Sequence, residues 1–119
     1  MIGTRTPPNV LFARAHGLFD AGEYDTAASI LAELAADITS DATATATGPD
    51  ALAVRLLLAR AYYHSAQLHR AETETRAVLA ADPANAYAHL LLGRTLQRQS
   101  RHDEARGPLR IAAAMGADQ

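Results

Sequence analysis

The chain matches itself at a fixed spacing, and this self-similarity constrains its fold more than any other feature. When the segment beginning at Leu52 is moved along the chain so that Leu52 falls on Ala86, Ala71 falls on Ala105. An earlier copy begins near Pro8, a longer step before the second copy. Self-similarity at a period of about 20 to 50 residues is typical of repeat proteins. The sequence therefore predicts a tail at 1–7 and a single domain at 8–119, with units at about 8–41, 52–85 and 86–119.

Each unit has the pattern of two amphipathic helices joined by a short turn. Ala and Leu supply most of the apolar residues, and both favour helix over strand. Gly22 marks the first turn within a unit, and Gln67 and Ser100 take its place in the later units. Asp82 and Pro83 together predict a capped helix start. The six predicted helices span 9–21, 24–38, 50–65, 68–81, 83–99 and 102–115.

The longer step between the first two units leaves extra residues between them. The segment at about 39–49, with the sequence TSDATATATGP, has low complexity and no helical periodicity. We therefore expect a flexible insertion there.

Small residues recur at equivalent places in the predicted helices. Small side chains allow the two helices of an antiparallel pair to approach closely. We therefore expect paired helices to touch at Ala15, Ala59 and Gly93 in the first helices of the units, and at Ala27, Ala71 and Ala105 in the second helices.

These units resemble the tetratricopeptide repeat (TPR) family, whose pattern is W-x2-L-G-x2-Y, then A-x3-F, then P. The third unit matches as His89-x2-Leu92-Gly93-x2-Leu96 and Ala105-x3-Leu109. The second matches as Arg55-x2-Leu58-Ala59-x2-Tyr62, Ala71-x3-Thr75 and Pro83. The first unit matches less fully, but its AGEYDTA segment is similar to the family's turn. The resemblance implies an all-α fold, in which three helix-turn-helix repeats form a short right-handed α-solenoid.

In TPR proteins the first helices of successive units line a concave groove that holds a peptide or a partner helix. The resemblance implies such a groove here, and helical geometry selects the side chains that point away from the packed seam. Arg60 and Arg94 occupy equivalent positions of the second and third units, so we expect them to stand side by side. The expected groove residues are Phe12, His16, Phe19, Leu57, Arg60, Tyr63, His64, Tyr87, Leu90, Arg94 and Arg98.

This set contains three Arg and no acidic residue, although the whole chain has a formal charge of −2. The planar guanidinium group matches the geometry of a carboxylate. We therefore expect a non-catalytic adaptor or scaffold that binds a protein or peptide, favouring an acidic or carboxylate-bearing partner. The alternative interpretation of the same Arg residues is a solvated helix face that keeps the protein soluble.

A second possible function is self-assembly through the last helix. Repeat arrays usually need a polar capping helix, because each unit buries its apolar face on the next one. Ile111 and Met115 belong to a final predicted helix with no such cap after it. This alternative predicts a structural module, such as a homodimer, that docks through these two residues.

Composition and motifs argue against other classes of function. The chain has no Cys, no Gly-rich phosphate loop and no catalytic triad, so we expect no enzyme activity and no cofactor. His16 and His64 lack the spacing of a helical zinc site, so we expect no metal. The absence of global basicity argues against nucleic acid. Neither a secretory signal nor an apolar run of about 20 residues is present, which predicts a cytoplasmic protein without a membrane segment.

Overall fold

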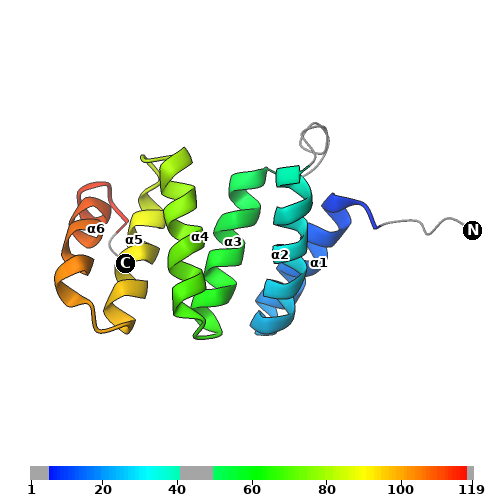
Figure 1. The fold of residues 1–119 in the computed structure, drawn as a ribbon, viewed down its shortest axis with the longest axis horizontal. Helices are drawn as coiled ribbons and strands as arrows, with labels where there is room; N and C mark the ends of the chain where they lie inside the picture. Colours follow the sequence, from blue (N-terminus) through cyan, green and yellow to red (C-terminus); the bar gives the residue numbers. More distant parts are fainter. Residues whose placement is uncertain (1–5, 41–49, 118–119) are drawn as a thin grey trace, which may run out of the picture.

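Six α-helices follow one another in the computed structural model, which describes residues 6–40 and 50–117 (Figure 1). No strand occurs in these residues, so the predicted all-α class is confirmed for them. The helices are α1 (Pro8–Asp20), α2 (Tyr24–Ser40), α3 (Ala51–His64), α4 (Leu68–Ala81), α5 (Ala86–Arg98) and α6 (His102–Ala114).

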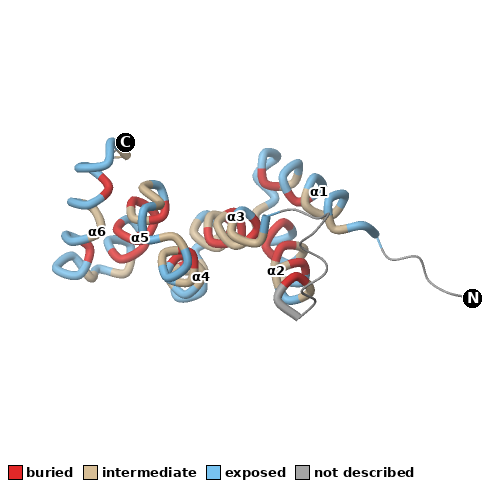
Figure 2. Tube along the Cα trace, turned by 90° about the horizontal axis from the view of Figure 1, so that it is seen from above, coloured by how far each residue is buried: buried red, intermediate tan, exposed pale blue. Residues whose placement is uncertain are grey.

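Each helix packs mainly against its neighbours in the chain, which gives an elongated row (Figure 1). Contacts between helices two apart in the chain join α1 to α3 and α3 to α5. Seen from above, α2 and α4 lie on the opposite side of the row from α1 (Figure 2). The first helix of each unit therefore approaches the first helix of the next, while α2 and α4 form the other side.

The turn within each unit has the same backbone structure three times. The Glu23 N–H donates to the Leu18 carbonyl at 2.8 Å, and the equivalent bonds join Gln67 to Tyr62 at 2.8 Å and Arg101 to Leu96 at 2.9 Å. One residue of each turn has a positive φ: Gly22 at 83°, Ala66 at 63° and Ser100 at 61°. The three turns are separated by the same longer first step and shorter second step as the three copies in the sequence. This agreement is consistent with a structural repeat.

Three of the predicted boundaries need correction. The left-handed residue of the second turn is Ala66, one position before the predicted Gln67. Pro83 does not begin α5, because the side chain of Asn85 accepts the Ala88 N–H at 2.9 Å and caps the helix there. The helix α2 runs to Ser40, two residues into the predicted insertion, and 41–49 lie outside the described residues.

The small residues that were expected at helix contacts are buried in the structure. Ala15, Ala59, Ala27 and Ala71 are fully buried, and Ala105 is almost so. At Gly93 the two helices approach closely, because a Cβ atom placed there would lie 2.5 Å from two side-chain carbons of Leu109 on α6. The absence of a side chain at this position is what allows α5 and α6 to pack so closely.

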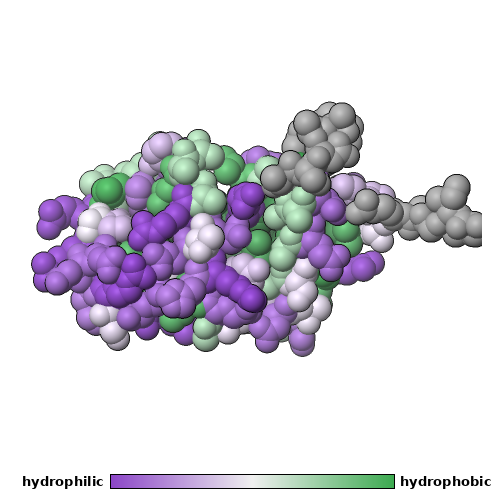
Figure 3. Space-filling model, viewed as in Figure 1, coloured by the Kyte–Doolittle hydropathy of each residue, from purple (hydrophilic) through white to green (hydrophobic). Residues whose placement is uncertain are grey.

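The side of the row formed by α2 and α4 is mixed in polarity. Figure 3 shows hydrophilic side chains over α4 and a paler, Ala-containing strip over α2. A shallow hollow of about 400 Å³ lies between α2, α3 and α4. Its lining consists of Ala32, Ala35, Ala36, Arg55, Leu58, Tyr62 and Glu74.

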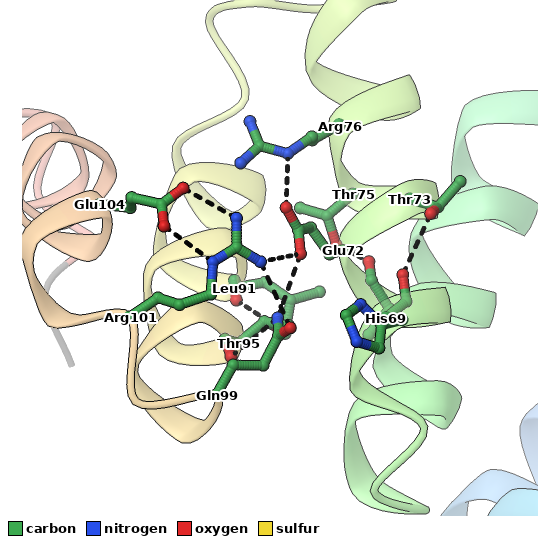
Figure 4. Close-up of polar contacts among 11 residues, drawn as sticks. His69, Glu72, Thr73, Thr75, Arg76, Leu91, Thr95, Gln99, Arg101 and Glu104 are labelled. Carbon is green, nitrogen blue, oxygen red and sulfur yellow. Dashed lines mark hydrogen bonds and ion pairs between the residues drawn. The ribbon is translucent and has the colours of Figure 1, made fainter.

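Glu72 on α4 links two units through charged hydrogen bonds (Figure 4). Its carboxylate accepts bonds from Arg101 at 2.7 Å, from Gln99 at 3.1 Å and from Arg76 at 2.9 Å. Arg101 also binds both oxygens of Glu104 at 2.8 Å. Although partial burial alone would raise it, the pKa of Glu72 falls to about 2 because these donors stabilise its charged form. The network therefore fastens α4 to the turn between α5 and α6.

Two Thr hydroxyls lie in the core without loss of hydrogen bonding. Thr75 donates to the Ala71 carbonyl at 2.6 Å, and Thr95 donates to the Leu91 carbonyl at 2.7 Å. Arg55, which stands at another usually apolar position of the repeat pattern, pairs with Glu74 at 2.9 Å. Arg55 and Thr75, the polar residues at usually apolar positions of the pattern, therefore find hydrogen-bond partners within the fold.

Gly93 provides a test of the α5–α6 packing. We expect Gly93→Leu to lower the free energy of unfolding by about 1–3 kcal/mol, because Leu109 and the backbone of α6 must move to admit the side chain. Gly17→Ala in α1 is the control, since a Cβ there meets no atom within 4 Å. That variant should keep or raise stability, because Ala is the better helix former. Urea unfolding followed by circular dichroism measures both, and a Gly93→Leu variant as stable as the wild type would contradict this packing.

Glu72 provides a test of the charged network. Glu72→Gln should lower the free energy of unfolding at pH 7 by roughly 1 kcal/mol, a figure that allows for screening by water. Because the pKa of Glu72 is depressed to about 2 in the fold, its stabilisation is present above the ordinary value of 4.5 and lost as pH falls toward 2. The difference between variant and wild type should therefore shrink between pH 5 and pH 2. The exposed Glu33 on α2 is the control, and Glu33→Gln should have little effect at either pH.

Candidate functional site

Side chains from three successive first helices meet around Arg60. The guanidinium carbon of Arg60 on α3 lies 4.7 Å from the ring centre of Phe19 on α1 and 5.5 Å from that of Tyr87 on α5. A guanidinium over an aromatic face is attracted by the ring quadrupole. These contacts hold the Arg60 side chain against the surface formed by α1, α3 and α5, which we call the first-helix face.

A cluster of rings lies beside Arg60. His64 stacks on Tyr24 of α2, with ring centres 4.6 Å apart and an angle of 20°. Its ring also meets Phe19 at 5.5 Å and Tyr63 at 5.4 Å, both in edge-on geometry. Partial burial lowers the pKa of His64 below its ordinary value, and the positive charges of Arg60 and Arg98 lower it further.

Arg98 on α5 is fixed by two contacts with the same residue of α3. Its guanidinium carbon lies 4.7 Å from the ring centre of Tyr63, and its Nη1 donates to the Tyr63 carbonyl at 2.7 Å. Arg98 therefore bridges α3 and α5 while its charge stays at the surface. We call Phe19, Tyr24, Arg60, Tyr63, His64, Tyr87 and Arg98 the cation–ring cluster.

No acidic side chain among the described residues forms an ion pair with Arg60, Arg94 or Arg98. The ion pairs of the described region instead hold Arg55, Arg76, Arg101 and Arg106. The Nε of Arg60 is buried and has no hydrogen-bond acceptor within this region. The cluster therefore carries cationic charge that has no anionic partner among residues 6–40 and 50–117.

The first helices of the units differ in charge from the second helices. The helices α1, α3 and α5 carry five Arg and a single acidic residue, Asp20. The helices α2, α4 and α6 carry four Arg and seven acidic residues. An acidic chain thus has first helices that are net cationic, and a nearby anion gains favourable electrostatic energy there.

The structure distributes the predicted groove residues unevenly. It brings Phe19, Arg60, Tyr63, His64, Tyr87 and Arg98 together in the cluster. Phe12 and His16 form a separate edge-on pair on α1, with ring centres 4.8 Å apart. Arg94 is exposed on α5. Leu57 and Leu90 are only 3% and 6% exposed, so they pack in the core and offer a ligand little surface.

Tyr24 was not among the predicted groove residues because it belongs to a second helix. It lies at the start of α2, directly after the turn at Gly22. This short turn keeps the start of α2 close to the end of α1. The ring of Tyr24 thereby reaches Phe19, at 5.1 Å, as well as His64. The position of Tyr24 directly after the turn was the sequence feature that could have placed it near the end of α1.

Within residues 6–40 and 50–117, no group of three or more His, Asp and Glu side chains is arranged to hold a metal ion. No helix in that region is both long enough and apolar enough to cross a membrane. The two predicted assembly residues, Ile111 on α6 and Met115 directly after it, are 44% and 43% exposed.

No family model and no curated protein matches the chain.

The charge environment of His64 can be tested without a ligand. In a proton NMR titration, we expect its pKa to lie below 6.5, because partial burial and two neighbouring cations disfavour the imidazolium form. Arg60→Gln and Arg98→Gln should each raise that pKa, while Arg76→Gln on α4 should leave it unchanged. If the pKa of His64 is unchanged in both Arg variants, the described arrangement of the cluster is wrong.

Proposed function

We propose that the chain is a TPR-like adaptor or scaffold domain, without catalytic activity, that binds a protein or peptide on its first-helix face. The favoured partner bears acidic side chains or a free carboxylate. The observation that carries this proposal is the cation–ring cluster, in which Arg60 and Arg98 are held by rings and lack an acidic partner within the described residues.

The repeated turns support the TPR-like part of the proposal. Equivalent hydrogen bonds and left-handed residues occur at equivalent positions of the three units. The contacts of α1 with α3 and of α3 with α5 suit an array whose first helices share one face. A right-handed α-solenoid with a concave first-helix face is the arrangement that the sequence resemblance implies.

The fixed positions of the two Arg side chains support recognition of carboxylates. Ordering a long side chain on binding costs free energy, and rings that already hold the guanidinium reduce this cost. Charge-assisted hydrogen bonds to a carboxylate are about twice as strong as neutral ones. The partly exposed ring of Tyr87, at 40%, adds apolar surface beside the charge. An acidic residue next to an apolar one fits this combination.

The same features favour a protein partner over a nucleic acid. The formal charge of −2 and the acidic second helices would repel a long phosphate backbone. A short acidic segment can instead contact the first-helix face alone. The proposal needs no cofactor and no metal.

Self-assembly through α6 is the second candidate function. Ile111 and Met115 are large apolar side chains exposed at the end of the row, and a second copy of the chain would cover them. The two functions use different surfaces, so substitutions on each can separate them.

The binding proposal is tested with a labelled synthetic peptide of alternating Glu and Leu, and with its Gln-for-Glu counterpart. We expect binding of the acidic peptide alone, weakened by added salt, since salt screens exposed charges. Arg60→Gln/Arg98→Gln should reduce affinity at least tenfold. Arg70→Gln/Arg110→Gln, on α4 and α6, changes the net charge equally and should reduce it far less. Fluorescence anisotropy measures the affinities, and circular dichroism confirms folding.

The opposite result would favour the assembly function. Substitution of the first-helix Arg residues could leave the affinity for a partner unchanged, while Ile111→Glu/Met115→Glu abolishes binding. In that case the binding surface is the C-terminal end of the row, at α6. A light-scattering mass that falls from dimer to monomer in the same variant would then identify a second copy as the occupant.

A further inference from the structure

His64 is the titratable side chain at the centre of the cation–ring cluster. From α1 and α2 it is faced by the rings of Phe19 and Tyr24. From its own helix it is faced by Arg60 and Tyr63, and from α5 by Arg98. The charged groups acting on its ring are thus two guanidinium groups, with no carboxylate to offset them in the described contacts.

A proton on His64 would add a third positive charge to this cluster. Without an anion nearby, the proton is disfavoured both by partial burial against the rings and by repulsion from Arg60 and Arg98. A carboxylate bound to either Arg would offset this repulsion, because it would neutralise the charge of the guanidinium group. It would also attract the imidazolium ion directly.

We propose that His64 takes up a proton when an acidic ligand binds at Arg60 and Arg98, so that the first-helix face binds acidic partners more tightly as pH falls. This inference rests on the proposed function and adds to it a dependence on pH. His64 acts as a third cation that appears only when the anion is in place.

The direction of the pH effect follows from proton linkage. The bound anion raises the pKa of His64 above its depressed value in the free protein, so the complex holds more protons than its separated components. Affinity therefore increases as pH falls from the pKa in the complex to the pKa in the free protein. A rise of one pKa unit corresponds to a tenfold change in affinity. We expect roughly a three- to tenfold gain between pH 8 and pH 5.5.

His69 and His102 serve as controls because they lie on second helices, away from the first-helix face. His102 is exposed on α6. His69 is exposed on α4, and His89 bonds the Pro83 carbonyl through Nε2 at 2.8 Å. None of these contacts involves Arg60 or Arg98.

The test measures binding of the Glu–Leu peptide to the full chain from pH 8 to pH 5.5, where Glu side chains stay ionised. His64→Phe keeps a ring to stack on Tyr24 but cannot take up a proton, and His64→Gln serves if that variant does not fold. His69→Gln and His102→Gln, on α4 and α6, are the matched controls. Calorimetry at pH 6.5 in two buffers of different ionisation enthalpy counts the protons taken up. NMR reports the pKa of His64 with and without peptide.

Supporting results are a three- to tenfold gain in affinity for the wild type and both controls, a flat profile for His64→Phe, and a higher His64 pKa in the complex. If the peptide binds through the Arg residues with the same affinity at every pH, or if His64→Phe keeps the gain, the inference fails and the proposed function stands. If the peptide binds at no pH, recognition of acidic ligands fails and the inference falls with it.

Discussion

The close approach of paired helices is the constraint on which the rest of this structure depends. Fully buried Ala residues recur where the helices of a pair meet, and Gly93 leaves room for Leu109 where α5 meets α6. Tight pairs bring the first helix of one unit within reach of the next, as the contacts of α3 with α1 and α5 show. Arg60 can touch Phe19 and Tyr87 only because three helices are held at this spacing.

Much of the fold could be predicted because its determinants are local and recur three times. The period of the sequence predicted the turns and the small residues at helix contacts, and the structure has them at the same spacing. The start of α5 was predicted wrongly, since Asp82 and Asn85 are both candidate caps and the choice between them depends on the path between units. Asn85 has the geometry to bond the Ala88 N–H, whereas Pro83 stays in the turn.

The candidate site was predictable in composition more than in contacts. Helical spacing selected Arg60, His64, Tyr87 and Arg98, which the structure brings into the cluster. The same spacing selected Leu57 and Leu90, but α3 and α5 have neighbours on both sides and bury a wide arc of their surface. The bond between Glu72 and Arg101 joins side chains far apart in the sequence, and no periodic signal marks it.

The position of the tyrosines has a practical consequence. Three of the four Tyr residues, Tyr24, Tyr63 and Tyr87, belong to the cation–ring cluster, and the chain contains no Trp. Ultraviolet emission of the unlabelled protein therefore originates mainly in the cation–ring cluster. Any event that shifts those phenol rings relative to their cationic neighbours changes the emission, so the molecule carries its own optical reporter in that cluster.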